Sequence, residues 1–193
     1  MRTTAPYDII AGMRIIAGEF GGRRIAAPKG IHTRPTSDRV REALFSILGG
    51  SVRGARVLDP FAGSGALGFE ALSRGASFAT FVDSDRGAAR CVAENAKALG
   101  VLDRIERFEG DWEAALGRMG GGFYDIAFLD PPYRMAGECA RVAERLYRAR
   151  RLAEGAILIA EEPRDAEGGF PPPFEVYDVR TYSDTRLSFM RIP

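Results

Sequence analysis

One strand–turn–helix–strand stretch near the middle of the sequence most constrains the fold of this chain. A short apolar segment, residues 56–59, runs into a glycine-rich segment at residues 63–68, which has the form G-x-G-x-x-G and opens a helical segment. A second apolar segment, residues 78–82, follows and ends at Asp83. A strand, a tight glycine turn, a helix and a second strand make a βαβ unit, which predicts two parallel strands joined by a crossover helix.

The same alternation continues along the chain. Two further helices are expected at residues 86–99 and 138–150. Three further buried strands are expected at residues 105–109, 123–129 and 156–160. Residues 174–181 and 186–192 then alternate polar and apolar side chains around a turn at Ser183 and Asp184, which is typical of an antiparallel hairpin. We therefore expect an α/β fold with a mostly parallel seven-stranded sheet that ends in an antiparallel C-terminal hairpin.

The chain is expected to divide into three parts. Residues 1–12 are weakly patterned and are predicted to be a flexible lead-in. Residues 13–50 are predicted to form a small N-terminal appendage, made of a β-hairpin around paired glycines and a helix over residues 36–48. Residues 51–193 are expected to form the α/β domain that carries the chemistry.

The N-terminal appendage is locally basic, although the whole chain has a formal net charge of only +1. Arginine forms planar, forked hydrogen bonds with phosphate groups, so this part is predicted to contact RNA. The arginines predicted to do so are Arg14, Arg23, Arg24, Arg34 and Arg39. Because the excess of positive charge is small, an ordinary solvated surface is the alternative interpretation.

The composition disfavours several classes of protein. His32 is the only histidine, and Cys91 and Cys139 stand apart, so a histidine-based triad, a metal site and a disulfide are not expected. No run of about 18 apolar residues occurs, so no membrane span is expected. The first twelve residues lack the long apolar region of a secretory signal, which makes a cytoplasmic location the expectation.

Acidic residues follow the predicted strands at four places, Asp59, Asp83, Asp111 and Asp130. The carboxyl ends of parallel strands meet at one edge of a sheet, and open α/β sheets bind ligands there. These four side chains are therefore expected to lie near one another around one ligand. Aspartate also caps helices at strand-to-helix junctions, which is the alternative interpretation of each acid taken alone.

The glycines and acids together predict a nucleoside cofactor. Asp83 lies about 20 residues beyond the first glycine, as in the dinucleotide fingerprint, so an NAD-dependent oxidoreductase is one hypothesis. Asp59 directly precedes the glycines, however, where a carboxylate suits a cationic ligand better than a pyrophosphate. S-adenosylmethionine carries an ammonium and a sulfonium, and it is the favoured cofactor. Asp83 would bind its ribose, Asp111 its adenine amine, and Trp112 would form an apolar wall. The residues predicted to bind it are Asp59, Phe61, Gly63, Ser64, Gly65, Asp83, Ser84, Asp111, Trp112 and Asp130.

The tetrapeptide Asp130-Pro131-Pro132-Tyr133 follows the strand predicted at residues 123–129 and is the predicted catalytic element. Its two prolines fix φ and remove two backbone donors. A planar base with an exocyclic amine would fit there. Asp130 and the Pro131 carbonyl would accept the amine hydrogens, while Tyr133 would stack on the ring. A rigid turn with a core tyrosine is the alternative interpretation.

These motifs carry a resemblance to a known family. D-P-F-A-G-S-G at residues 59–65, together with D-P-P-Y at residues 130–133, resembles the class I, S-adenosylmethionine-dependent N-methyltransferases, whose fold is Rossmann-like. R-I-I-A-G at residues 14–18, G-G-R-R at residues 21–24 and R-P-T-S-D-R-V-R-E-A-L-F at residues 34–45 resemble the RsmD family of bacterial 16S rRNA guanine-N2 methyltransferases.

The resemblance to the RsmD family runs from about Met13 to the end of the chain. It implies methyl transfer to the exocyclic N2 amine of guanine 966 in 16S rRNA, which would be free or within a partly or fully assembled 30S subunit. Many relatives have asparagine where this chain has Asp130, and glutamate where it has Asp83. Three alternatives stay open: DNA adenine-N6 methylation, an NAD-dependent oxidoreductase and a catalytically silent RNA-binding protein.

Overall fold

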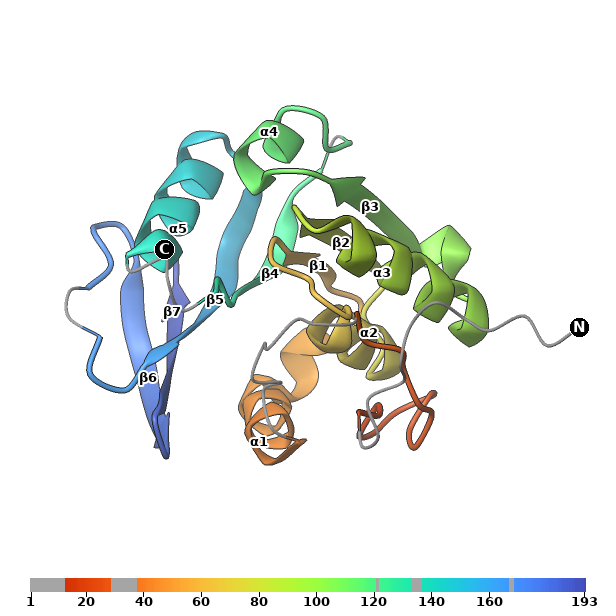
Figure 1. The fold of residues 1–193 in the computed structure, drawn as a ribbon. Helices are drawn as coiled ribbons and strands as arrows, with labels where there is room; N and C mark the ends of the chain where they lie inside the picture. The colour runs from red at the N-terminus through yellow and green to blue at the C-terminus, as the bar shows by residue number, and fades with distance from the viewer. Residues whose placement is uncertain (1–12, 29–37, 121, 133–136, 167–168) are drawn as a thin grey trace, which may run out of the picture.

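The computed structural model, which describes residues 13–28, 38–120, 122–132, 137–166 and 169–193, is built around one seven-stranded sheet. The strand order is β3-β2-β1-β4-β5-β7-β6 (Figure 1). The strands are β1 (Arg56–Asp59), β2 (Phe78–Asp83), β3 (Ile105–Glu109), β4 (Tyr124–Leu129), β5 (Leu152–Pro163), β6 (Glu175–Tyr182) and β7 (Thr185–Arg191). The first five strands are parallel, and β7 is antiparallel to both β5 and β6. The expected sheet and its antiparallel C-terminal hairpin are confirmed.

Five α-helices in the described residues cover the two faces of the sheet. They are α1 (Asp38–Leu48), α2 (Ala66–Ser73), α3 (Arg86–Leu99), α4 (Trp112–Leu116) and α5 (Glu138–Arg148). Helices α1, α2 and α3 contribute Phe45, Leu72 and Val92 to a first core cluster, whereas α4 and α5 contribute Leu116 and Val142 to a second. Figure 1 accordingly has α1 and α2 below the sheet and α4 and α5 above it. Within the described ranges, every helix is too short or too polar to cross a membrane.

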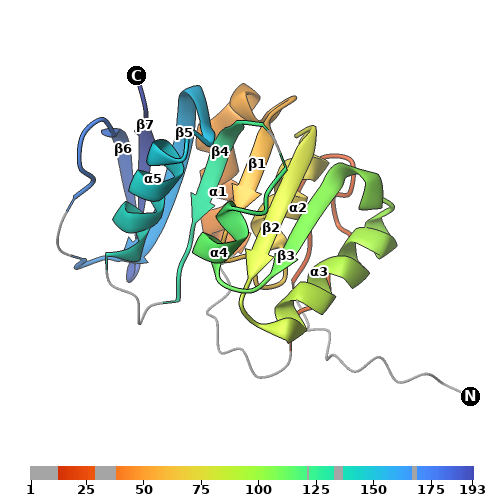
Figure 2. The same ribbon diagram turned by 90° about the horizontal axis from the view of Figure 1, so that it is seen from above.

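The strands of the sheet centre are apolar on both faces because helices cover both of them. Along β4, Ile126 and Phe128 join the first cluster, while Ala127 and Leu129 join the second. Strands buried in this way read as continuous apolar runs, which is why the sequence revealed them. The arrowheads of β1, β2 and β4 point to the same edge of the sheet, here called the carboxyl edge (Figure 2).

Apart from shifts of one or two residues at the ends of several elements, three differences from the expectation stand out. Strand β5 is longer than the expected residues 156–160, because it pairs with β4 from Leu152 and with β7 as far as Pro163. Helix α4 was not expected, since it has only five residues. Helix α1 ends at Leu48 as expected, but a 3-10 turn, Gly49–Val52, continues it.

The predicted N-terminal hairpin is present in a minimal form, as an antiparallel bridge between Arg14 and Arg24 with the backbone N–H of Ile15 donating to the carbonyl of Arg23 at 3.0 Å. The backbone N–H groups of Ile16 and Ala17 donate to the Glu70 carboxylate, at 2.7 and 3.1 Å. These groups are therefore bonded to a side chain of α2 and not to a facing strand. A local glycine pattern cannot reveal an acceptor that lies more than fifty residues away in the sequence.

Residues 13–28, here called the head loop, pack into the same core as the sheet. Ile15, Phe20 and Ile25 are buried members of the first core cluster. Gly18 allows this close approach, because a Cβ at its φ of +85° would lie 1.9 Å from the carbonyl oxygen of Ser73. The head loop is thus fixed directly against α2.

Candidate active site

The glycine segment between β1 and α2 uses its glycines in two different ways. Gly63 and Gly65 have φ of +54° and +80°, which glycine adopts without strain. A Cβ on Gly63 would meet nothing within 4 Å, so the backbone there borders open space. A Cβ on Gly68 would lie 2.2 Å from the ring of Phe81, so this glycine lets α2 pack closely on β2. Only the first part of the segment is therefore open to a ligand.

Four carboxylates continue one face of the sheet at the carboxyl edge. Along β2, β1, β4 and β5, the side chains on the first-cluster face end with Phe81, Val57, Phe128 and Ile159. Side chains alternate along a strand, so two residues later the same face carries an acid on each of four adjacent strands. These acids, here called the acid row, are Asp83, Asp59, Asp130 and Glu161. Burial raises the pKa of Asp59 and of Asp130, and the charges of their neighbours in the row raise both further.

Asp59 is the most buried member of the acid row, with 2% of its surface exposed. The backbone N–H groups of Phe61 and Gly68 donate to it, yet its Oδ1 has no hydrogen-bond partner among the described residues. Burial, and then the charge of Asp83, raises the pKa of Asp59 to about 7. A buried acceptor without a donor is costly and suits a site that receives a donor or a cation from a ligand.

Asp83 holds the glycine segment and the start of α3 in place. Its Oδ2 accepts from the backbone N–H of Gly63 at 2.7 Å, and its Oδ1 accepts from that of Asp85 at 2.8 Å. Burial raises the pKa of Asp83 more than these bonds lower it. Each carboxylate oxygen has a second lone pair, so Asp83 can still accept from ligand hydroxyls. The neighbouring Ser84 is exposed.

Asp130 directly follows β4, at the middle of the acid row. Burial raises its pKa well above the ordinary value, and the charges of Glu161 and Asp59 raise it further. Pro131 is half-buried and Pro132 is exposed, so the chain turns outward from the carboxyl edge after Asp130. An acid in this environment can accept hydrogen bonds and holds a proton more readily than an exposed aspartate does.

Glu161 was not among the residues expected from the sequence. It follows the apolar run of β5, and Ala160 pairs with Leu129, so Glu161 lies beside Asp130 in the parallel register. Its sequence neighbour Glu162 has the same side chain, which hides the distinction between the two. The alternation of faces along β5 could have identified it, because Glu161 follows Ile157 and Ile159 at steps of two residues and so lies on their face.

Asp111 and Trp112 lie at the start of α4, on the second face of the sheet. The Asp111 Oδ1 accepts from the backbone N–H groups of Glu113 and Ala114, at 2.9 and 3.2 Å, and so caps the helix. Trp112 is buried in the second core cluster, and its indole donates to Glu138 at 2.8 Å. The predicted contacts of both residues with adenine stay predictions.

Ser64 links the glycine segment to the head loop. Its side chain donates to the sulfur of Met13 at 3.1 Å, and its carbonyl accepts from the Asn95 side chain at 2.9 Å. The same Asn95 amide accepts from the N–H of Ala26 and donates to its carbonyl, at 2.8 and 3.0 Å. Asn95 was not expected, because a polar residue in the middle of a helix has no distinguishing local pattern.

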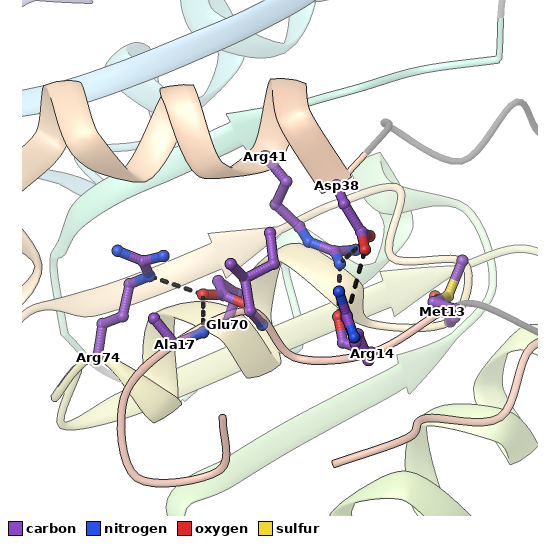
Figure 3. Close-up of polar contacts among 9 residues, drawn as sticks. Met13, Arg14, Ala17, Asp38, Arg41, Glu70 and Arg74 are labelled. Atoms are coloured by element: carbon purple, nitrogen blue, oxygen red, sulfur yellow. Dashed lines mark hydrogen bonds and ion pairs between the residues drawn. The ribbon is translucent and has the colours of Figure 1, made fainter. Parts of the chain in front are cut away.

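Glu70 links helix α2 to the head loop (Figure 3). It is fully buried, and it accepts from two backbone N–H groups of the head loop and from the Nε of Arg74 at 2.7 Å. Nearby, the Arg41 guanidinium donates to the carbonyl of Arg14 and to Asp38, at 2.5 and 2.9 Å. Buried charged groups with several partners fix a unique arrangement of α1, α2 and the head loop.

The arginines predicted to contact RNA are placed on the surface where the structure describes them. The exposed ones are Arg14, Arg23, Arg24 and Arg39. Arg14 lies 3.7 Å from Asp38, and Arg23 donates to the carbonyl of Ala98. Arg34 and Tyr133 lie outside the described residues, and so does the predicted lead-in at residues 1–12. Phe61 is half-buried against the second core cluster, on the strand-to-helix turn before Gly63.

Known proteins resemble this chain over most of its length. The "Putative rRNA methyltransferase YlbH" of Bacillus subtilis is 39% identical over 158 residues, which are 80% of this chain and 85% of that protein. The "Ribosomal RNA small subunit methyltransferase D" of Escherichia coli K12 is 36% identical over 159 residues, which are 82% of this chain and 78% of that protein.

A solved structure and a family model agree with these relatives. The structure of the "Putative methyltransferase yhhF" from Escherichia coli matches with a TM-score of 0.83 and 31% identity, covering 93% of this chain and 97% of that one. The fold is thus that of the class I methyltransferases. The family model described as "Conserved hypothetical protein 95" matches residues 13–191. The chain therefore belongs to this family, the RsmD family that its motifs resemble.

Proposed function

We propose that this protein transfers a methyl group from S-adenosylmethionine to the exocyclic N2 amine of a guanine in 16S ribosomal RNA, at guanine 966. The observation that carries the proposal is the acid row, which includes Asp130 at the Asp130-Pro131-Pro132 strand exit and is bonded through Asp83 to Gly63, at the open part of the glycine segment. Membership in a family with relatives named as ribosomal RNA methyltransferases supports the class of substrate.

The residues of the acid row and the glycine segment fit a cationic nucleoside cofactor. Asp59 has a buried oxygen that lacks a donor, and Gly63 leaves open space in front of its backbone. In this proposal Asp59 faces the positively charged part of the cofactor and Asp83 accepts from the ribose hydroxyls. Gly63, Ser64 and Gly65 provide the backbone surface. S-adenosylmethionine supplies an electrophilic methyl group when it is bound.

Asp130 and Pro131 orient the amine that receives the methyl group. The amine lone pair of guanine is delocalised into the ring, which makes it a poor nucleophile. Hydrogen bonds from its two hydrogens to the Asp130 carboxylate and the Pro131 carbonyl would make the amine pyramidal and direct its lone pair toward the methyl group. Positioning of this kind lowers the barrier without a covalent enzyme intermediate. The raised pKa of Asp130 also equips it to hold the proton that the amine loses.

The head loop and the start of α1 contact the phosphate backbone of the RNA in this proposal. Arg14, Arg23, Arg24 and Arg39 are exposed there, and the buried Glu70 holds the loop in a fixed position. The target base must leave its stack to reach Asp130. A rigid contact between the head loop and the RNA phosphates helps to keep the unstacked base at Asp130.

Methylation of three substrate forms in parallel tests the proposal. Purified protein is incubated with methyl-labelled S-adenosylmethionine and naked 16S rRNA, a protein-bound assembly intermediate or whole 30S subunits, all from cells that lack this modification. The RNA is then digested to nucleosides. We expect label in N2-methylguanosine from at least one form, and primer extension should place it at guanine 966.

Other products of the same experiment would contradict the proposal. Label in N6-methyladenosine, from RNA or from added duplex DNA, would favour the DNA adenine-N6 alternative. No transfer to any form, together with calorimetric binding of NAD and not of S-adenosylmethionine, would favour the oxidoreductase. RNA binding without transfer would identify a catalytically silent RNA-binding protein.

A further inference from the structure

Glu161 of β5 lies beside Asp130 at the carboxyl edge. Leu129 and Ala160 are paired in the parallel register of β4 and β5, so Asp130 and Glu161 are the next residues on the two strands. Adjacent strands are about 4.7–4.9 Å apart, which leaves two such side chains within reach of one small planar ligand. On the other side of β5, Glu161 pairs with Leu187 of β7.

The two side chains also share a face of the sheet. Phe128 and Ile159 both belong to the first core cluster, and Asp130 and Glu161 follow them by two residues. After burial, Glu161 is the largest influence on the ionisation of Asp130, ahead of Asp59. Glu161 is half-buried, so part of its surface stays accessible. It is therefore the next carboxylate that a ligand bound at Asp130 would meet.

A second observation indicates that the acid row receives a ligand. The Oδ1 of Asp59 is buried and has no hydrogen-bond partner among the residues that the structure describes. In the proposed function, the cofactor contacts Asp83 and Asp59, which are the members of the acid row at the ends of β2 and β1. The part on β4 and β5 is left for the base, because it lies at the opposite end of the row.

The chemistry of the base decides what a second carboxylate would recognise. Guanine has an N1–H donor directly next to its N2 amine, so its edge offers neighbouring donors to neighbouring carboxylates. In adenine and in 2-aminopurine the N1 atom is an acceptor, which a carboxylate repels. A carboxylate has about four acceptor positions, so Glu161 can accept from a base in addition to its contacts within the protein.

We propose that Glu161 determines base specificity by accepting a hydrogen bond from the N1–H of the target guanine while Asp130 accepts from the N2 amine. This inference rests on the proposed function and names the residue that would select the base. The carboxylate rejects bases with an unprotonated N1, because their lone pair would face its negative charge without a bridging proton.

A swap of donor and acceptor tests this role. Glu161→Gln keeps the shape and one oxygen acceptor, but it removes the negative charge and adds an N–H donor, which suits an N1 acceptor. The substrate is the form of 16S rRNA that the wild type methylates, with either guanine or 2-aminopurine at the target position. 2-Aminopurine keeps the amine and lacks the N1–H. We expect Glu161→Gln to lower kcat/KM on guanine at least about tenfold and to raise it on 2-aminopurine, so the preference for guanine falls by more than about tenfold.

The neighbouring Glu162 provides the matched control. Glu162 lies on the opposite face of β5 and forms an ion pair with Arg186 at 2.9 Å, so Glu162→Gln should keep the wild-type preference for guanine. Glu161→Ala provides a second variant, which should lose activity on guanine without gaining any on 2-aminopurine. Far-UV circular dichroism and calorimetric cofactor binding show whether each variant is folded.

Two outcomes would overturn the inference, and they differ from failure of the proposed function. If kcat/KM falls equally on guanine and on 2-aminopurine in folded Glu161→Gln, then Glu161 is a positioning residue and does not select the base. A shifted pH profile with an unchanged base preference would mean that it acts only on the ionisation of Asp130. Failure of the proposed function would appear earlier, as the absence of N2-methylguanosine with the wild-type protein.

Discussion

At the scale of single residues, the acid row dominates the chemistry of the carboxyl edge. Carboxylates that are buried together resist ionisation, and the pKa values of Asp59, Asp83 and Asp130 are all raised. Such an arrangement weakens the folded state near neutral pH and is typical of a functional site. A ligand that brings positive charge or hydrogen-bond donors would relieve this repulsion.

Asp83→Ala should weaken S-adenosylmethionine binding at least tenfold. The variant loses hydrogen bonds to a charged acceptor, which contribute roughly 1.5–3 kcal/mol, and it also frees the N–H of Gly63. Isothermal titration calorimetry measures the change, and RNA affinity should hold as the control. An unchanged dissociation constant in the folded variant would exclude Asp83 from the cofactor site.

Asp130→Ala should lower kcat by about a hundredfold or more, because a preorganised acceptor aimed at the reacting amine commonly contributes about 3 kcal/mol. Asp130→Asn keeps one oxygen acceptor and should retain partial activity. Cofactor affinity should change little in either variant. If Asn and Ala lose activity equally, the negative charge matters as a proton acceptor. Full activity in Asp130→Ala would contradict the mechanism.

At the scale of elements, α2 connects the glycine segment to the head loop. Its N-terminus begins at the glycine segment, and its last two turns present Glu70 and Ser73 to the head loop. The helix has eight residues, of which only Ala66 is not buried. This short buried helix therefore fixes the position of the head loop relative to the glycine segment.

Glu70→Gln should destabilise the protein by about 1–3 kcal/mol, because one carboxylate oxygen becomes an NH2 group that would face the backbone N–H of either Ile16 or Ala17. Urea unfolding measures this change. Glu144→Gln is the matched control, since Glu144 also pairs with an arginine four residues later, but its side chain is 42% exposed whereas that of Glu70 is fully buried. That control should cost less than about 0.5 kcal/mol. Equal effects would mean that the burial of Glu70 contributes nothing.

Replacing Arg23 and Arg24 together with alanine should raise the dissociation constant for RNA and flatten its dependence on salt. Binding releases fewer counterions when a phosphate contact is lost, so the slope of log K against log salt concentration changes by roughly 0.7–0.9 per contact. Filter binding over a range of salt concentrations measures the slope, and cofactor affinity serves as the control. A slope equal to that of the wild type would make this part of the head loop an ordinary solvated surface.

At the scale of the whole molecule, the topology concentrates negative charge at one edge of the sheet, while the formal net charge of the chain is only +1. The pKa of Asp59 is raised to about 7, so the proton that it holds stabilises the folded state at acid pH. This stabilisation is complete below the unfolded pKa near 3.8 and is lost as the pH rises through about 7.

Asp59→Asn should therefore stabilise the ligand-free protein more at pH 8 than at pH 5, by on the order of 2 kcal/mol. At pH 8 the wild type carries a buried charge that the amide lacks, whereas at pH 5 both side chains are neutral. Urea unfolding of both proteins at each pH measures the difference. The exposed Asp103→Asn is the control and should show little change between the two values. A pH-independent effect would mean that Asp59 stays ionised throughout.

Much of the site could be predicted because its residues lie where strands end. The apolar runs of β1, β2 and β4 mark their own boundaries, so Asp59, Asp83 and Asp130 could be assigned to the carboxyl edge from spacing alone. Glu161, Glu70 and Asn95 could not be assigned. Their roles depend on partners that the chain meets only after folding, such as the head loop for Glu70.

The sequence by itself determined the βαβ order, the parallel sheet with its antiparallel end, and the family, because alternation and glycine spacing are local properties of the chain. The tertiary structure decided that the head loop, which forms a minimal antiparallel bridge, is bonded mainly to the Glu70 side chain of α2 along Ile16 and Ala17. It also decided that Asp111 caps a helix and that Glu161 completes the acid row. Hydrogen-bond partners and strand register are set by contacts between distant segments, and a local pattern carries no information about them.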